Sequence, residues 1–411
     1  MESSIFRVTQ PVGLTLLTSG ILRVMADVVR APSLSELNKR KSYKWRQHPT
    51  DVIPLPVAEM DFIIADEIKM ALRDMVDRSD TGYLGAFPEL FEAFSDFAKL
   101  RWNWEVDKDH VRIASDVGLA TVEVMRTLMS PGDKVMLNSP VYDNTWRWIA
   151  EVKATLVDVP LLLQGEIGDG ARYTLDLERI ESEYKSGVKI HILCHPHNPV
   201  GAIMDKETLS RLATLAKKYG VYVISDEIFG CMVFDRRDFT PFQAVSDDAR
   251  EVGITVTSAS KGFNLAGLKC ALIVTSSPVI KEKINSLPIA VAFRASLFGA
   301  VAATTAFRES ASWLDGVMVV LDENRRLLRN LIDSRIPAVK YRTPDFGYLA
   351  WLDVSELKLG EDPAKTLLER GKVALNGGHM YGPQHSQFVR FNFGTSPEII
   401  SEAFDRILRS I

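Results

Sequence analysis

The chain has 411 residues, of which 46% are hydrophobic and 25% are charged, and its formal net charge at pH 7 is −4. This is the composition of an ordinary globular protein long enough for two or three domains. A net charge this small provides no basic surface for nucleic acid and no polybasic patch for a membrane, so we expect neither as a partner. The sequence contains no apolar run of about 18 residues, and we therefore expect no membrane-spanning helix.

Two features bear on the cellular location. Residues 12–29 are moderately apolar but interrupted by polar side chains, whereas a signal peptide has a basic start and a cleaner apolar centre. We therefore interpret the first 30 or so residues as a helical or irregular arm. The three cysteines, Cys194, Cys231 and Cys270, lie in apolar surroundings and cannot form a disulfide framework, which favours a reducing compartment. We expect a cytoplasmic protein.

From about residue 110 to 276, short apolar segments alternate with amphipathic ones. The clearest helix is predicted over Asp205–Tyr219, where Asp205 can cap the first turn and Gly220 can end the last. Alternation of strand and helix indicates a mostly parallel sheet with helices on both faces. The predicted strands are Asp133–Asn138, Lys153–Val159, Lys189–Cys194, Val221–Ser225, Ile254–Ser258 and Cys270–Thr275.

Beyond about residue 300 the pattern changes. A long helical region over Ala311–Ile332 is followed by two short strands, Tyr348–Leu352 and Gln387–Phe393. We expect a separate, smaller α+β unit here. In such proteins, ligands bind at the carboxyl ends of the large-domain strands, near the domain interface.

The most informative residue is Lys261, which follows small hydroxyl residues and precedes two glycines. A lysine in these surroundings suits Schiff-base chemistry on a phosphorylated cofactor, because small neighbours let amides and hydroxyls close around a phosphate. Ser258 and Lys269 could supply one neutral and one cationic phosphate partner. Taken alone, a lysine is more often a solvated surface charge.

Two polar residues follow predicted buried strands. Asp226 needs a partner if it keeps its charge in such a place, and a protonated pyridinium nitrogen would be one. A helix cap or a surface acid is the alternative. Asn198 lies in His195–Gly201, where two prolines and a glycine predict a tight turn that presents its side chain above the sheet.

The same region raises the alternative of a metal site. His191, Cys194, His195 and His197 are close in sequence. Their spacing is not a zinc signature, and no second Cys/His pair accompanies them. We therefore expect no bound metal.

Three further segments could complete a binding site. Val117 and Gly118 precede a helical stretch to about Leu128, and amides at a helix start can bind phosphate. The run Asn138–Tyr142 ends a strand, and the Tyr142 ring could stack on a flat cofactor, although an aromatic there is more often core. Alternation over Phe388–Phe393 puts Arg390 on the face opposite the apolar residues, where it would bind a substrate carboxylate or form an internal salt bridge.

Together these segments resemble the fold-type-I pyridoxal-phosphate enzymes of the class I/II aminotransferase superfamily, from Pro54 nearly to the C-terminus. The runs Pro54–Phe62, Pro196–Pro199 and Ser260–Gly267 resemble its MalY/PatB branch of cystathionine β-lyases and other carbon–sulfur lyases. The resemblance implies the aspartate aminotransferase-like fold, with a mostly parallel seven-stranded large-domain sheet and a smaller α+β domain. It also implies an N-terminal arm over residues 1–57 that contributes to the small domain, a large domain over 58–300 and a small domain over 301–411.

The resemblance further implies pyridoxal 5'-phosphate as cofactor and a role for each candidate residue. Lys261 would form the Schiff base and Arg390 would hold the substrate α-carboxylate. The cofactor-binding residues would be Asp226 at the pyridinium nitrogen, Asn198 at the ring hydroxyl oxygen, Tyr142 stacked on the ring, and Val117, Gly118, Ser258 and Lys269 at the phosphate. Tyr83 resembles a tyrosine that reaches a neighbouring subunit's phosphate, so the resemblance implies a homodimer with shared active sites.

Two positions depart from the family pattern. Phe229 stands where aminotransferases usually have tyrosine and the lyase branch usually histidine, and phenylalanine cannot hydrogen-bond the ring oxygen. Lys269 replaces an arginine and supplies charge without a bidentate fork. The resemblance favours a β-lyase that cleaves L-cystathionine or related cysteine S-conjugates to thiol, pyruvate and ammonia. An aminotransferase and a cofactor-binding regulatory protein with little turnover are the alternatives.

Overall fold

A computed structural model describes residues 29–234 and 239–411. The arm expected over the first 30 residues lies almost wholly outside this part of the chain. Within it, no helix combines the length and the apolar character that a membrane span requires.

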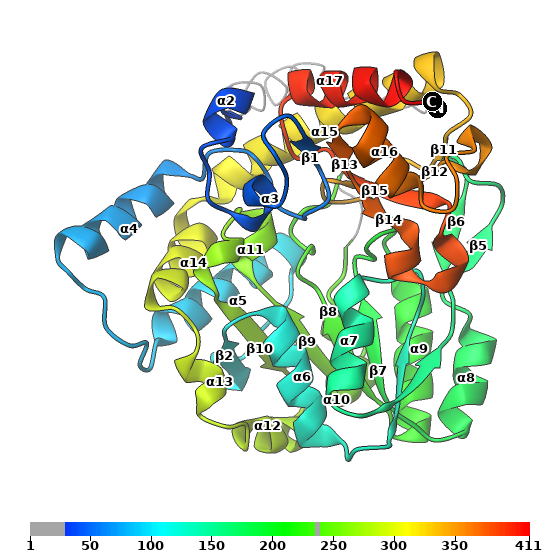
Figure 1. Cartoon of the computed structure of the whole chain (residues 1–411). Helices are drawn as coiled ribbons and strands as arrows, with labels where there is room; N and C mark the ends of the chain where they lie inside the picture. Colours follow the sequence, from blue (N-terminus) through cyan, green and yellow to red (C-terminus); the bar gives the residue numbers. More distant parts are fainter. Residues whose placement is uncertain (1–28, 235–238) are drawn as a thin grey trace, which may run out of the picture.

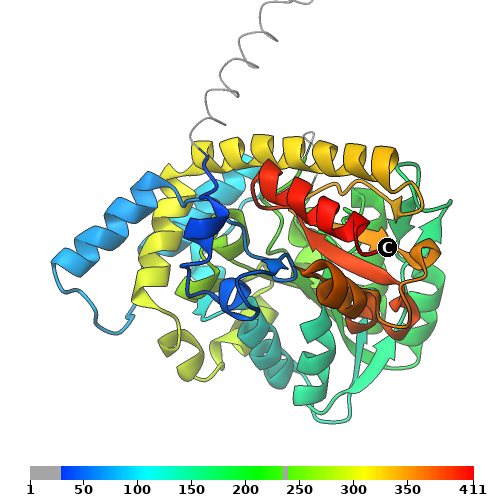
Figure 2. The same ribbon diagram turned by 45° about the horizontal axis from the view of Figure 1, so that its top comes forward.

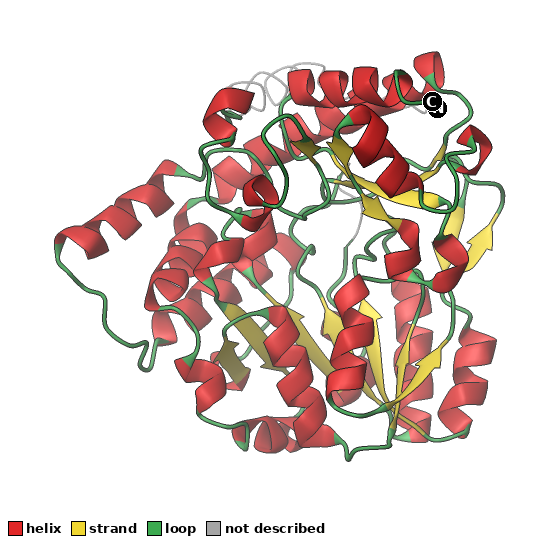
Figure 3. Ribbon diagram, in the orientation of Figure 1, coloured by secondary structure: helices red, strands yellow, loops and turns green. Residues whose placement is uncertain are grey.

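The larger unit is built on a seven-stranded sheet (Figures 1 and 3). Its strands pair in parallel, except that β10 runs antiparallel to both of its neighbours. The expected mostly parallel seven-stranded sheet is therefore confirmed. In spatial order the strands are β2 (Val111–Ala114), β10 (Ala271–Thr275), β9 (Gly253–Thr257), β8 (Tyr222–Asp226), β7 (Val188–Cys194), β3 (Lys134–Leu137) and β4 (Thr155–Asp158).

Alternate residues of the central strands enter two different apolar cores, one on each face of the sheet. On β8, Val223 belongs to the core that contains α9 (Lys206–Tyr219), whereas Ile224 belongs to the core that contains α6 (Val117–Leu128). This period of two places a helical layer on each face. The α9 prediction is confirmed in detail, because Asp205 caps the Thr208 amide at 2.7 Å and Gly220 ends the helix at φ 68°.

The predicted strands agree with the observed ones to within one or two residues at each end. Strand β2 was not predicted, because its four residues, Val111–Ala114, include a charged arginine and are too few to show a pattern.

The smaller unit contains a four-stranded antiparallel sheet in the order β11 (Lys340–Tyr341), β12 (Leu349–Asp353), β15 (Phe388–Asn392) and β14 (Asn376–Gly377). The helix α15 (Ala311–Arg335) crosses the top of the molecule beside α17 (Pro397–Leu408) (Figure 2). Strand β1 (Ile53–Pro54) pairs in parallel with β13 (Val373–Ala374) of this unit. We propose on this basis that the residues before 58 join the small domain, and the boundaries at 57 and 300 stay predictions.

The structure also contains a hairpin and further α-helices. A hairpin is formed by β5 (Leu162–Gln164) and β6 (Arg172–Thr174). The other α-helices are α2 (Leu34–Leu37), α3 (Tyr43–Arg46), α4 (Asp66–Asp77), α5 (Pro88–Trp102), α7 (Asp143–Glu151), α8 (Leu177–Lys185), α10 (Asp247–Val252), α11 (Ala259–Gly262), α12 (Pro278–Asn285), α13 (Ala290–Phe293), α14 (Leu297–Glu309) and α16 (Pro363–Gly371).

Candidate active site

A cavity of about 580 Å³ lies at the carboxyl ends of the parallel strands, beside the small unit. This is where a sheet of this kind is expected to bind ligands. Its wall contains Val117, Gly118, Tyr142, Asn198, Asp226, Ser258, Lys261, Lys269 and Arg390. Tyr83 is the one predicted site residue outside this wall, and its side chain is 89% exposed.

The amine of Lys261 is held inside the cavity. Lys261 lies on α11, whose first turn is capped by Ser258 through the Ser260 amide at 3.1 Å. Its Nζ donates to the backbone carbonyl of Ala58 at 2.8 Å. Burial, and secondly the positive charge of Arg390, lower the pKa of Lys261 to about 8. A lysine with such a pKa is deprotonated in part near neutral pH and can act as a nucleophile or base.

The segment 57–62, which carries the Ala58 carbonyl, is fixed from two sides by asparagine side chains. Asn392 Nδ2 donates to the carbonyls of Val57 and Glu59 at 2.7 and 2.8 Å. Asn264 Nδ2 donates to the carbonyls of Met60 and Phe62 at 3.0 and 3.1 Å. These contacts join the segment to both β15 and the loop after Lys261.

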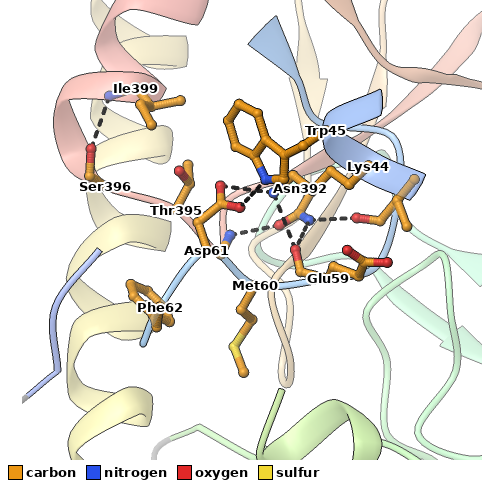
Figure 4. A network of polar contacts seen from close by, with 12 residues as sticks. Lys44, Trp45, Glu59, Met60, Asp61, Phe62, Asn392, Thr395, Ser396 and Ile399 are labelled. Carbon is orange, nitrogen blue, oxygen red and sulfur yellow. Dashed lines mark hydrogen bonds and ion pairs between the residues drawn. The ribbon is translucent and has the colours of Figure 1, made fainter. Parts of the chain in front are cut away.

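A buried ion pair holds the same segment from a third side (Figure 4). Lys44 Nζ and Trp45 Nε1 donate to the two carboxylate oxygens of Asp61 at 2.8 and 2.9 Å. Both Lys44 and Asp61 are inaccessible to solvent, and a buried charge without its partner would be costly. The helix α3 is therefore anchored beside the cavity.

Asp226 ends β8 as a buried carboxylate. It accepts a hydrogen bond from the Ile228 amide at 3.2 Å and forms no ion pair with any residue of the described chain. Burial raises the pKa of Asp226 to about 6. A cationic group entering the cavity would stabilise its ionised form.

Arg390 places an uncompensated positive charge in the cavity wall. Its side chain is 2% exposed, donates to Asn198 Oδ1 at 3.1 Å and to the Pro56 carbonyl at 2.8 Å, and lies over the Tyr381 ring at 5.1 Å. Its Nε has no hydrogen-bond partner, and across residues 29–234 and 239–411 no carboxylate forms an ion pair with it. The internal salt bridge is thus not found, and the site can accept an anion from outside.

The start of α6 provides a second place for an anion. Asp116 caps the Leu119 amide at 2.8 Å, while the amides of Val117 and Gly118 occupy the first helical positions, which lack intrahelical partners. A Cβ atom at Gly118 would lie 2.9 Å from the ring of Trp148. A larger residue at this position would therefore require the Trp148 ring to shift.

The side-chain phosphate partners are already engaged in this structure. Lys269 Nζ forms an ion pair with Asp116 Oδ2 at 3.2 Å, and Ser258 Oγ donates to the Cys270 carbonyl at 2.6 Å. Both could contact a phosphate only by sharing or exchanging these bonds. Their predicted roles stay predictions.

Two aromatic residues border the cavity in different ways. Tyr142 packs edge-on against Trp148, and its hydroxyl accepts a hydrogen bond from Asn144 at 2.6 Å, which leaves its ring in the wall. Phe229 is buried against Phe346 and Tyr348. Its ring contributes no donor to the cavity.

Comparisons with known proteins agree with this geometry. The family described as aminotransferase class I and II matches residues 50–407. The chain belongs to this family. A protein of Mycobacterium tuberculosis is 36% identical over 392 residues, covering 91% of this chain and 95% of its own.

Two named relatives and one solved structure show which members of this family the chain is similar to. The cystathionine beta-lyase of Corynebacterium glutamicum is 31% identical, covering 92% of this chain and 99% of its own. Cystathionine beta-lyase PatB of Bacillus subtilis is 30% identical, covering 87% and 92%. The crystal structure of cystalysin from Treponema denticola, which contains a pyridoxal 5'-phosphate cofactor, has a TM-score of 0.85 at 26% identity, covering 91% and 96%. The expected aspartate aminotransferase-like fold is confirmed by the structure of an aspartate aminotransferase of Thermus thermophilus, which has a TM-score of 0.78 at 22% identity, covering 94% of this chain and 99% of its own.

The sequence did not predict several parts of this site. The Ala58 carbonyl holds Lys261 through a backbone atom, which no side-chain pattern reveals. Tyr43 and Gln47 come from the N-terminal part, and Asp143 and Arg147 from α7. For Asp143 and Arg147, the helical periodicity of the residues after Tyr142 could have indicated a helix beginning beside the site.

Histidines of the cluster near residue 195 form hydrogen bonds within the protein. His191 bonds Tyr184 and Asn138 at 2.7 Å each, and His197 bonds the Pro140 carbonyl at 2.9 Å. In the described part of the chain, no three His, Cys, Asp or Glu side chains are grouped so as to hold a metal ion.

Proposed function

We propose that the chain is a pyridoxal-phosphate-dependent carbon–sulfur β-lyase, which cleaves L-cystathionine or related cysteine S-conjugates to a thiol, pyruvate and ammonia. The observation that carries the proposal is the convergence of Lys261, Asp226 and Arg390 in one cavity of a chain whose relatives at 30% identity or more include two named cystathionine β-lyases.

The cavity fits the cofactor chemically. Its one buried free carboxylate, Asp226, suits a cationic ring nitrogen, and the amides of Val117 and Gly118 suit a phosphate. Lys261 supplies a partly neutral amine for the aldehyde. When bound, pyridoxal phosphate provides the carbonyl that captures the substrate amine and a ring that accepts the electrons released at the α-carbon.

Residues of the chain orient the substrate and remove its α-proton. Arg390 orients the amino acid by its α-carboxylate, because its guanidinium is the buried uncompensated cation of the cavity wall. The amine of Lys261 removes the α-proton as a general base. The bond between the β-carbon and sulfur then breaks, the thiolate leaves with the bonding electrons, and one water is consumed in forming pyruvate and ammonia.

An aminotransferase would use the same residues, so the reaction itself must be measured. Purified protein is given L-cystathionine with and without pyruvate as amino acceptor. A lyase releases thiol and pyruvate without an acceptor. Formation of alanine only when pyruvate is added would instead identify an aminotransferase, and no product in either mixture would favour a regulatory protein.

We also propose a homodimer in the cytoplasm. The exposed Tyr83 supports a contact with a second subunit, because it lies on a projecting loop beyond α4 (Figure 1). All three cysteines are free, which supports a reducing compartment.

A further inference from the structure

A pair of opposite charges on α7 lines the same cavity and takes no part in the proposed chemistry. Asp143 begins this helix and Arg147 lies four residues later, so the two side chains project from one side of it, about 6 Å apart along its axis. An acid four residues before a base is the arrangement that usually pairs. Here no ion pair joins them to each other or to any other described side chain.

Their position is at the mouth of the cavity. Arg147 is exposed and Asp143 half-buried, whereas Arg390 is buried. The charge of Asp143 is felt inside the cavity: burial is the main cause of the raised pKa of Tyr381, the ring under Arg390, and the negative charge of Asp143 adds to it. Tyr43 and Gln47 of the N-terminal part line the same cavity.

We propose that Asp143 and Arg147 form a distal subsite for substrates whose leaving thiol carries a charged end, with Arg147 binding a carboxylate and Asp143 an ammonium group. This inference rests on the proposed lyase function and narrows its substrate class. Arg390 fixes one end of the amino acid, so a substituent on sulfur extends toward the mouth. A zwitterionic end, such as that of L-cystathionine, matches two unpaired charges of opposite sign better than an alkyl end does.

The test uses the holoenzyme and probes that differ only at the far end. S-ethyl-L-cysteine is neutral there, S-carboxymethyl-L-cysteine is anionic, and S-(2-aminoethyl)-L-cysteine is cationic. Arg147→Gln is expected to lower kcat/KM for the carboxymethyl probe, relative to the ethyl probe, about three- to tenfold and mainly through KM. Asp143→Asn is expected to lower kcat/KM for the aminoethyl probe, relative to the ethyl probe, to a similar extent. For L-cystathionine, kcat/KM should fall in either variant.

Each variant is the control for the other, and Arg211→Gln, on the exposed side of α9, should change none of these ratios. Ratios that stay at the wild-type value in both variants would overturn the distal subsite and leave the lyase intact. If the wild type cleaves none of the probes and no L-cystathionine, the proposed function fails and the subsite fails with it.

Discussion

Arg390 and Asn198 are joined by a hydrogen bond of 3.1 Å that fixes what each can offer to a ligand. A guanidinium only donates, so the atom of Asn198 that it contacts must be the amide oxygen. The Nδ2 group of Asn198 is then the one left to face the cavity, which suits the acceptor oxygen expected on the cofactor ring. The arginine that would hold the substrate therefore also orients the asparagine that would hold the cofactor.

Arg390→Lys should separate charge from geometry. Lysine keeps the positive charge but lacks the planar guanidinium fork, so it cannot keep the bonds to Asn198 and Pro56 and also bind a carboxylate through two hydrogen bonds. We expect kcat/KM to fall about a hundredfold, equivalent to about 3 kcal/mol, in steady-state assays of thiol release. Arg409→Lys, on an exposed position, is the matched control. A loss of less than threefold would contradict the role of Arg390 in substrate binding.

Asp226→Asn should stabilise the cofactor-free protein at neutral pH while weakening cofactor retention. Burial raises the folded-state pKa of Asp226 to about 6, whereas an unfolded aspartate has a pKa near about 3.9. Between these values the folded state binds more protons, so wild-type stability falls as pH rises from about 4 to 6 and stays lower above that range. Asparagine removes this loss, which is on the order of 3 kcal/mol.

Urea unfolding of the cofactor-free proteins at pH 5 and pH 7.5 measures this difference. The advantage of the variant should be larger at the higher pH, and the variant should release cofactor faster on dialysis. A variant that is less stable than wild type at pH 7.5 would show that Asp226 is satisfied within the protein, as a helix cap would be.

The sequence predicted those parts of the site that depend on side-chain type at a strand end. Asp226 ends β8, Asn198 follows β7, and alternation on β15 placed Arg390 toward the cavity. It could not predict contacts made through backbone atoms, such as the Ala58 carbonyl that holds Lys261, because any residue offers the same carbonyl.

Long-range placement was also out of reach. Asp61 meets Lys44 and Trp45 because β1 pairs with β13 and fixes the path of the N-terminal part, which no local pattern encodes. The antiparallel direction of β10 depends likewise on the crossover that precedes it. Local periodicity specifies which segments are strands but not which way each one runs.

Gly118→Ala should disturb the start of α6. The added Cβ would lie 2.9 Å from Trp148, so the indole ring or the helix start must move. Overpacking of this kind costs about 1–3 kcal/mol, and the better helix propensity of alanine offsets part of it. We expect Tm to fall by about 2–4 °C and cofactor affinity to fall. Gly170→Ala is the matched control, because a Cβ there meets nothing within 4 Å, and equal effects of both changes would contradict the close approach.

Tyr83→Phe should weaken cofactor retention only if Tyr83 reaches the cavity of a second subunit, because Tyr83 does not line the cavity of its own chain. The neighbouring helix α4 exposes Met70 and Val76 by 61% and 60%, so Met70→Glu is expected to shift the protein toward monomers in sedimentation experiments. Cofactor loss on dialysis should then increase in both variants, whereas Tyr222→Phe, which also removes one tyrosine hydroxyl, should have no effect. A monomer that keeps full activity and cofactor at low concentration would refute the shared site. Such a result would leave Val117, Gly118, Ser258 and Lys269 as the phosphate partners within one chain.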